Sequence, residues 1–467
     1  MSSKAPAAAA SPRPLAESTL WSLQVDRMVW MLLGVALLLR LLVMLIFFRA
    51  PDPILEDGDF YISIAQDIGR LFFPADPLMA VTSIGPIYPF FLWPFFNIPP
   101  DQAVNVQFAT ARIAQALVDT TTVFFVYMIA RQLFGETVGR VALIAQALDV
   151  RYLFVAGTIT TEPLYIALMA SFFALLISTQ DKLDLRLFRW LGLLLGIAVL
   201  TRPVPLLFPA VLFALAWLNR EKRLDLLRGF GWMTAIMVIV ILPYTVRTMI
   251  VSDEAIPVVD TAAAHFFARS REDGHEIDFI EAQQEEIGYG ADNPNVEGAE
   301  FLEAGFSNIL DAPLTWLANM GRDVLRAYVQ PYGTVILTPG DEPAVRELAQ
   351  SWLRGEIGLG ELIGVAGFWR RLLMYAFHFW SLLFGLVGAG LLIAKQDQQL
   401  NRAAPLLVWI VYGTLISAPL LIEPRYVFPL MFAFTVLAAY ASVTLVGLLF
   451  KNAQGFQLGQ AELSRGH

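Results

Sequence analysis

Long apolar runs alternate with short polar connections along most of the chain. The first run covers Val29 to Phe48, and nine more follow at roughly 113–130, 141–156, 164–178, 188–200, 204–218, 230–250, 372–394, 403–421 and 427–449. A perpendicular helix needs about 20 apolar residues to cross a bilayer, so the shorter runs require tilt or cover from neighbours. The pattern predicts an all-α polytopic membrane protein with about ten transmembrane helices and an external helical loop region.

Two of these runs admit another interpretation. The run at 29–48 is longer than a signal-peptide core and ends in Arg49-Ala50-Pro51-Asp52 rather than in a small-residue cleavage site, so we expect it to remain as the first membrane helix. The region 188–218 is broken at Thr201-Arg202-Pro203, and it is read either as two spans or as a re-entrant pair.

Basic residues fall in every second connection, which predicts the orientation. By the positive-inside rule, both termini are cytoplasmic and an even number of spans is required. The predicted divisions are a cytoplasmic tail at 1–28, helices one to seven at 29–251 with an external first loop at 50–104, an external segment at 252–367, helices eight to ten at 368–450, and a cytoplasmic tail at 451–467. The protein is therefore expected in the cytoplasmic (inner) membrane, with its site facing the periplasm or exterior.

Charge and composition agree with this division and exclude several functions. Of the residues, 57% are hydrophobic and only 16% are charged, where soluble proteins carry about a quarter. The segment 252–367 has 21 Asp and Glu against 6 Arg and no Lys, a net charge of −15, which makes nucleic acid an implausible partner. With no cysteine, thiol catalysis, disulfides and cysteine-bound metal are excluded.

Sequence motifs for soluble cofactor chemistry are missing. The chain has no phosphate-binding Gly-rich loop ending in Lys-Ser/Thr, no G-x-G-x-x-G, no HExxH and no G-x-S-x-G. The cytoplasmic loops are also too short to hold a nucleotide-sugar domain. If the protein is a transferase, its donor must therefore be presented from the membrane.

Four charged residues lie within predicted spans, where charge is costly. We expect Arg40, Asp119, Asp149 and Arg151 to join helices through partners on neighbouring spans. Asp149 and Arg151 are two residues apart, and on a continuous helix such residues do not face each other, so we expect them not to pair together.

A second charged group gathers at the predicted outer boundary of the membrane, arriving from five separate places. Its members are Asp57, Asp59, Glu162, Arg202, Arg247 and Arg425. A guanidinium binds phosphate bidentately, whereas carboxylates suit a general base, a cation or sugar hydroxyls. Together these residue types predict a site for a phosphorylated lipid headgroup and a group that loses a proton.

Short motifs around these residues resemble a known family. Asp57-Gly58-Asp59-Phe60-Tyr61, Gly85-Pro86-Ile87-Tyr88-Pro89, Ala111-Arg112, Thr161-Glu162-Pro163, Leu200-Thr201-Arg202-Pro203, Pro243-Tyr244 to Arg247, and Arg425-Tyr426 occur in the order found in the GT-C superfamily of polyprenyl-phosphate-sugar glycosyltransferases. The chain is most similar to the protein O-mannosyltransferase and aminoarabinose transferase group, of the glycosyltransferase family 39 type. The resemblance covers about residues 32–449 and is weak across 252–367.

The resemblance implies a GT-C-like fold and an inverting sugar transfer without a covalent intermediate. It implies catalytic roles for Asp57 and Asp59, with Asp57 as general base, and substrate-binding roles for Tyr61, Arg112, Glu162, Arg202, Arg247, Arg425 and Tyr426. The family's second acidic residue directly after the first-loop Asp is Gly58 here, so which carboxylate is the base stays open. The resemblance implies no cofactor with certainty. Whether a divalent cation binds, and which residues would be its ligands, stays open.

The implied partners are a polyprenyl-phosphate-sugar donor, membrane lipids and a lipid, glycan or protein acceptor, but not nucleic acid. Alternatives from other classes are a secondary transporter or flippase of envelope precursors, and a non-catalytic scaffold. A transporter more typically carries repeat symmetry, and no internal repeat is present in this sequence.

Overall fold

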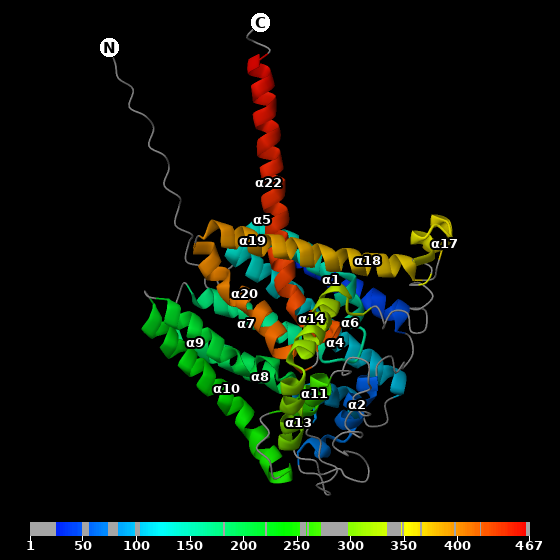
Figure 1. Ribbon diagram of the computed structural model, residues 1–467, viewed down its shortest axis with the longest axis vertical. Helices are drawn as coiled ribbons and strands as arrows, with labels where there is room; N and C mark the ends of the chain where they lie inside the picture. The colour runs from blue at the N-terminus through cyan, green and yellow to red at the C-terminus, as the bar shows by residue number, and fades with distance from the viewer. Residues whose placement is uncertain are drawn as a thin grey trace.

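Helices and short connecting turns make up the chain wherever its structure is described (Figure 1). The computed structural model describes residues 25–48, 56–72, 83–98, 103–180, 183–219, 222–252, 258, 261–271, 298–333, 347, 350–364, 367–396, 398–420 and 422–463. No β-strand occurs within these ranges, so the all-α prediction is confirmed.

Among the described residues, seven segments are long and apolar enough to cross a membrane. They comprise α1 (Arg27–Phe47), α4 (Val104–Phe134), α7 (Glu162–Thr179), α10 (Arg223–Ser252), α18 to α19 (Phe368–Phe379 and Gly385–Lys395, joined by the π-helical turn η4, Trp380–Phe384), α20 (Gln398–Ser417), and α21 to α22 (Pro424–Val427 and Met431–Leu463, joined by η5, Phe428–Leu430). The chain is thus a multi-pass membrane protein.

The three other predicted spans are helical but shorter. They are α5 (Glu136–Leu148) followed by α6 (Val150–Val155), α8 (Leu185–Thr201), and η3 (Val204–Leu207) followed by α9 (Phe208–Leu218). The count of about ten therefore stays a prediction, of which seven spans meet the criteria of length and apolarity.

The remaining helices belong to the two loops that the sequence predicts on one side of the membrane. The first loop contains α2 (Glu56–Gln66), η1 (Ile68–Leu71) and α3 (Ile87–Asn97), and the acidic segment contains α11 (Thr261–Ser270), α13 (Gly298–Asp311), α14 (Pro313–Val329) and α17 (Leu359–Ile363). In Figure 1, α2, α11 and α13 lie at the end of the molecule away from α18 and α19.

Close backbone contact between α8 and α10 depends on glycine. A Cβ atom added at Gly192 would lie 2.3 Å from the carbonyl oxygen of Met233, and one at Gly196 would lie 2.8 Å from Val240 Cβ. Small residues spaced four apart allow helices to approach in this way where lipid supplies no hydrophobic driving force between them. This contact fixes the end of α8, from which Arg202 follows.

Arg40 and Asp119 form a buried ion pair between α1 and α4. Arg40 Nε donates to Asp119 Oδ2 at 2.6 Å, Arg40 Nη1 donates to the Ala36 carbonyl at 3.0 Å, and both residues are at most 1% exposed. The prediction that these two residues join helices is confirmed.

Asp149 and Arg151 do pair with each other, so the expectation that they would not is wrong. The helix stops at Asp149, which has an extended backbone (ψ 110°) and caps α6 by accepting from the Arg151 amide at 3.0 Å. The rule against pairing holds for a continuous helix, and this interruption lets Arg151 Nη2 reach Asp149 Oδ2 at 2.5 Å.

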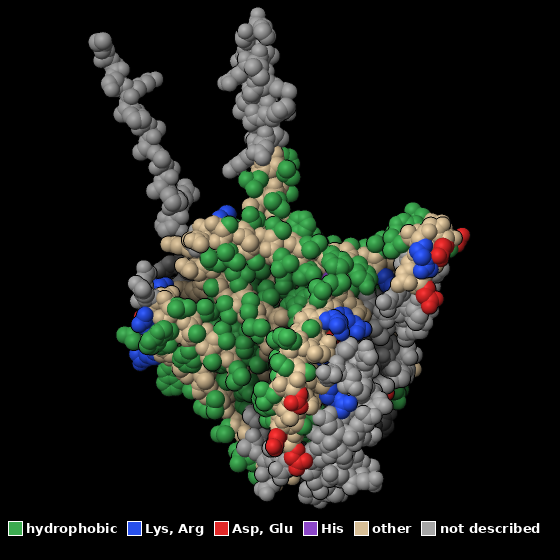
Figure 2. Space-filling view, in the orientation of Figure 1, with side chains coloured by type: hydrophobic (Ala, Val, Ile, Leu, Met, Phe, Trp, Pro, Cys, Tyr) green, Lys and Arg blue, Asp and Glu red, His purple; other side chains and the backbone are tan. Residues whose placement is uncertain are grey.

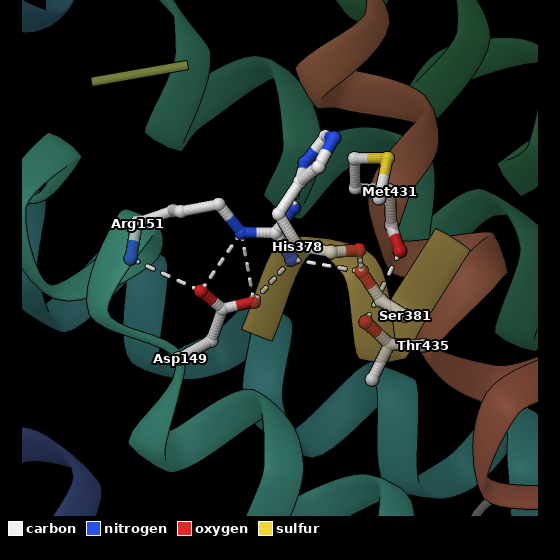
Figure 3. Close-up of polar contacts among 6 residues, drawn as sticks. All are labelled: Asp149, Arg151, His378, Ser381, Met431 and Thr435. Atoms are coloured by element: carbon white, nitrogen blue, oxygen red, sulfur yellow. Dashed lines mark hydrogen bonds and ion pairs between the residues drawn. The ribbon is translucent and has the colours of Figure 1, made fainter. Parts of the chain in front are cut away.

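The same Arg151 also joins α6 to the span that α18 and η4 form (Figure 3). Its Nη1 lies 2.8 Å from His378 Nδ1, and its Nη2 donates to Ser381 Oγ at 3.1 Å. The other imidazole nitrogen, His378 Nε2, lies 2.7 Å from the Tyr328 carbonyl, which can only accept, so Nε2 donates and Nδ1 is the acceptor for Arg151. Arg151 thereby ties α14 of the acidic segment to the membrane bundle, so this pair joins helices as predicted.

We expect Arg40→Leu to lower the free energy of unfolding by about 3–5 kcal/mol, because it leaves the Asp119 carboxylate buried and unpaired. The double variant Arg40→Leu/Asp119→Leu should recover most of this loss. Thermal unfolding in detergent micelles measures both. Arg140→Leu, which breaks half-exposed ion pairs to Asp26 and Glu136, is the control and should change stability by no more than about 1 kcal/mol. Equal losses in the single and double variants would contradict the argument.

Candidate active site

Glu162 is the centre of a charged cluster assembled from three helices. The residue opens α7, and its side chain is fully buried. Its Oε1 accepts from Arg202 Nη1 at 2.8 Å and from Arg425 Nε at 2.5 Å. One buried carboxylate oxygen thus accepts from two guanidiniums, and it holds both arginines at one point.

Arg202 is further held by aromatic rings. Its guanidinium lies 5.2 Å from the centre of the Tyr426 ring and 5.9 Å from that of Tyr165, within the range of cation–π attraction. Arg202 itself has an extended backbone (φ −147°, ψ 128°) at the end of α8, ahead of Pro203, which disfavours helical geometry in the residue before it. The break at this proline therefore turns the arginine out of the helix and toward Glu162.

A cavity of about 420 Å³ lies beside this cluster and includes Arg202, Tyr426 and Tyr61 in its wall. The polar part of the wall also contains His265, Tyr412, Ser417, Thr201 and Ser83. The apolar part contains Val204, Leu206, Leu207, Val258, Ala262, Ile84, Ile416 and Leu420, with Gly85 and Pro203 between. A wall of this kind suits a ligand with one charged end and one apolar end.

The first loop is packed against the cluster through aromatic residues. The ring of Tyr61 on α2 meets that of Tyr88 on α3 edge-on at 5.0 Å, and the Tyr88 hydroxyl donates to Gln115 Oε1 at 2.8 Å. Gln115 Nε2 in turn donates to the carbonyls of Ala156 (3.1 Å) and Thr158, in the turn that leads into Glu162. Burial raises the pKa of Tyr88 well above its usual value, so the hydroxyl stays protonated as a donor.

Because Gly85 has no side chain, the first loop can contact the end of α8 closely. A Cβ atom there would lie 2.1 Å from the carbonyl oxygen of Leu200, which only glycine avoids. The loop therefore forms part of the cavity wall directly beside Arg202.

Part of the chain is similar to a known protein family. Residues 83–246 match the family model of dolichyl-phosphate-mannose-protein mannosyltransferases. No curated protein sequence matches the chain.

Solved structures match over nearly the whole chain. The oligosaccharyltransferase of Archaeoglobus fulgidus in its apo form superposes with a TM-score of 0.54 at 14% identity, covering 92% of this chain and 52% of that chain. Its complex with an inhibitory peptide and a dolichol-phosphate gives 0.51 at 15% identity, covering 92% and 51%. The chain thus spans about half the length of that enzyme. ArnT from Cupriavidus metallidurans bound to undecaprenyl phosphate gives 0.41 at 13% identity, covering 89% and 77%.

The chain has the GT-C fold. The fold thus agrees with the order of the sequence motifs, and the prediction of a GT-C-like architecture is confirmed.

Three of the predicted site residues meet directly in this GT-C chain. Glu162, Arg202 and Arg425 form the cluster described above. Tyr61 and Tyr426 share the cavity wall with Arg202.

Arg112 contacts the backbone just before the first loop, and Arg247 contacts the backbone near the middle of that loop. Arg112 Nη1 donates to the Phe48 carbonyl at 2.9 Å, where α1 ends. Arg247 Nε and Nη2 donate to the carbonyls of Phe72 (3.0 Å) and Arg70 (2.9 Å), in and just after η1. Both side chains are 3% exposed, so these contacts fasten the loop to the bundle from inside.

The two predicted catalytic carboxylates both belong to α2. Asp59 is exposed, and the Asp57 side chain lies outside the described residues. No group of three His, Asp or Glu side chains that could hold a metal ion occurs in the part of the chain that the structure describes. Because Asp57 falls outside that description, a divalent cation stays open as a cofactor in this GT-C chain.

Sequence reasoning missed His265, Tyr165 and Tyr412. His265 lies in the acidic segment, where the family resemblance is weakest, and Tyr165 and Tyr412 look like ordinary interior aromatics within apolar runs. The chain has only four histidines, and that scarcity was the one signal available for His265.

We expect Arg247→Ala to speed amide hydrogen exchange around residues 68–72 at least about fivefold, because two loop carbonyls lose their donors. Exchange followed by mass spectrometry measures this. The control Arg228→Ala removes an exposed arginine near the other end of α10 and should leave exchange in the loop unchanged. Arg247→Lys should be intermediate, since an ammonium lacks the fork that reaches two carbonyls. An unaltered exchange pattern in Arg247→Ala would show that the loop is held by other contacts.

Proposed function

We propose that this protein is a membrane glycosyltransferase that transfers a sugar from a polyprenyl-phosphate donor to a lipid, glycan or protein acceptor. The observation that carries the proposal is the cavity beside Glu162. Among the described residues of its wall, Arg202 is the one with a permanent charge. A phosphate with an attached lipid chain matches such a cavity in both charge and polarity.

Arginine is suited to the phosphate end of this donor. A guanidinium carries five N–H donors, more than a single carboxylate oxygen can accept, so Arg202 can hold Glu162 and contact a ligand together. The neighbouring Arg425 brings a second guanidinium to the same carboxylate, and guanidiniums are the side chains best suited to bind phosphate. Glu162 positions both guanidiniums before the ligand arrives, and preorganised donors are the most effective kind in catalysis.

The relatives support the choice of donor. The matching family is described as using dolichyl-phosphate-mannose, and the oligosaccharyltransferase of the same fold was solved with a dolichol-phosphate. Because the lipid carrier dissolves in the bilayer, a chain without a nucleotide-sugar domain obtains its donor there.

The proposed reaction is an inverting displacement. Asp57 removes the proton from an acceptor hydroxyl, whose oxygen forms a bond to the anomeric carbon. The bond from that carbon to the phosphate oxygen breaks, and the lipid phosphate leaves with the electron pair. Arg202 and Arg425 stabilise the charge that develops on the leaving phosphate.

Helical register favours Asp57 over Asp59 as the base. Residues four apart on an α-helix share a face, so the position of Asp57 on α2 lies on the face that carries Tyr61, a residue of the cavity wall. Asp59 is two residues from Tyr61 and is exposed. In this proposal Asp59 contacts sugar hydroxyls or a cation, and Tyr61 and Tyr426 line the path of the substrate.

Arg112 and Arg247 have an indirect role in the proposal. By fastening the chain on both sides of α2, they keep that helix against the cavity. Direct contact of either arginine with substrate stays a prediction. The acidic segment 252–367 is proposed to cap the site on the external face, opposite both cytoplasmic termini, with the domain boundaries as predicted from the sequence.

We expect Arg202→Gln to weaken binding of decaprenyl phosphate at least about tenfold, because the cavity wall loses its charge-assisted donor. Binding to protein in lipid nanodiscs measures this. The matched control is Arg189→Gln. Arg189 is near the opposite end of α8 and stacks on Trp232, so this variant should bind decaprenyl phosphate as wild type does. Equal affinities for all three proteins would place the lipid phosphate elsewhere.

We expect Asp57→Asn to reduce sugar transfer by about 10²–10⁴-fold without unfolding the protein, because general-base assistance is lost. The measurement is mass spectrometry of envelope glycans and glycolipids from a deletion strain complemented with wild type, Asp57→Asn or Asp59→Asn. One sugar should vanish on deletion and return with wild type but not with Asp57→Asn.

The same experiment separates the alternatives. If Asp57→Asn restores the sugar and Asp59→Asn does not, Asp59 is the base. If both variants restore it, the protein is not a transferase of the proposed mechanism, and a transporter or flippase is favoured instead.

A further inference from the structure

His265 brings an imidazole from the acidic segment into the wall of the cavity. It belongs to α11 and shares the wall with Arg202, Tyr61 and Tyr426. Val258 and Ala262 of the same segment line the cavity beside it. The acidic segment therefore supplies part of the pocket itself as well as its cover.

Ion pairs hold α11 in register with the charged cluster. Arg269, one turn after His265, lies 3.4 Å from Asp323 on α14 and 4.0 Å from Glu423, two residues before Arg425. Phe266 fits against the bare backbone of Gly305 on α13, where a Cβ atom would lie 2.8 Å from its ring. The position of His265 relative to Arg202 is thus set by contacts on both sides of the helix.

The imidazole differs chemically from the other groups in the wall. Burial and the nearby Arg269 guanidinium hold the pKa of His265 below its usual range, so the ring is neutral at pH 7. A neutral imidazole offers one donor and one acceptor, as a sugar hydroxyl does. No carboxylate lines the described cavity, so His265 is its strongest neutral hydrogen-bond acceptor among side chains.

We infer that His265 is a specificity-determining residue that hydrogen-bonds a hydroxyl group of the donor sugar inside the cavity. The inference rests on the proposed function. In a polyprenyl-phosphate sugar the ring is joined to the phosphate through one oxygen, so a phosphate held by Arg202 keeps its sugar in the same space. The cavity of about 420 Å³ is within the ~300–1,000 Å³ typical of small-molecule sites.

A pH dependence follows from the charge on the ring. Among the described residues, the charged and titratable groups that share the cavity wall with His265 are Arg202, Tyr61, Tyr412 and Tyr426. Arg269 follows it on α11 and is itself paired with Asp323 and Glu423. Protonation makes the ring a donor only and adds a cation near Arg202 and Arg269. Sugar recognition is therefore complete at neutral pH and is lost as the pH falls through the lowered pKa of His265.

The test compares lipids with and without a sugar. Binding of decaprenyl phosphate and of decaprenyl-phosphate-linked mannose, glucose and arabinose is measured with the full-length protein in nanodiscs. Wild type should bind one sugar-bearing lipid more tightly than the bare phosphate. His265→Ala should lose that preference, about five- to tenfold, while its affinity for decaprenyl phosphate stays within about twofold of wild type.

Two further variants keep the result specific. His265→Gln retains a neutral donor and acceptor but cannot titrate, so it should keep part of the preference and should show no loss of it as the pH is lowered from about 7.5, unlike wild type. Ala264→Ser changes the neighbouring residue, which does not line the cavity, and should match wild type.

Each outcome bears on one claim. A full sugar preference in His265→Ala, or a wild type without any preference among the four lipids, overturns the inference and leaves the proposed function standing. A wild type that binds none of the four lipids overturns the proposed function and the inference with it.

Discussion

A charge placed among membrane helices must find a partner, and the arrangement of this bundle follows from that constraint. Isolated charges in a low-dielectric interior cost several kcal/mol each, so they persist only in pairs with additional hydrogen bonds. Arg40–Asp119 and Asp149–Arg151 meet this condition as neutral pairs, and each joins segments distant in the sequence. They hold helices together and leave no charge for a ligand.

The cluster at Glu162 differs from these pairs in its geometry. One buried carboxylate is shared by Arg202 and Arg425, whose side chains are 11% and 22% exposed where Glu162 is fully buried. The guanidiniums therefore lie at the accessible side of the cluster, and Arg202 is in the cavity wall. The two other pairs are buried on both sides, and this difference in exposure separates them from the cluster that the proposal uses.

The two loops reach this cluster by different means. The first loop is fastened by arginines of the bundle that donate to backbone carbonyls on both sides of α2, at Phe48 before this helix and at Arg70 and Phe72 after it. The acidic segment is fastened by the hydrogen bond between the Tyr328 carbonyl and His378 and by the ion pair of Arg269 with Glu423. These two sets of contacts place one polar side chain of each loop, Tyr61 and His265, in the wall of the same cavity.

Hydropathy and charge parity along the chain determined the helical class, the main membrane spans and the set of polar residues at helix ends, because these are local properties read one segment at a time. Which residues meet was decided by tertiary structure. The sharing of Glu162 by two arginines, the loop contacts of Arg247 and the presence of His265 in the cavity all depend on distances between segments up to 263 residues apart. Periodicity carries no record of such distances, because only packing sets them.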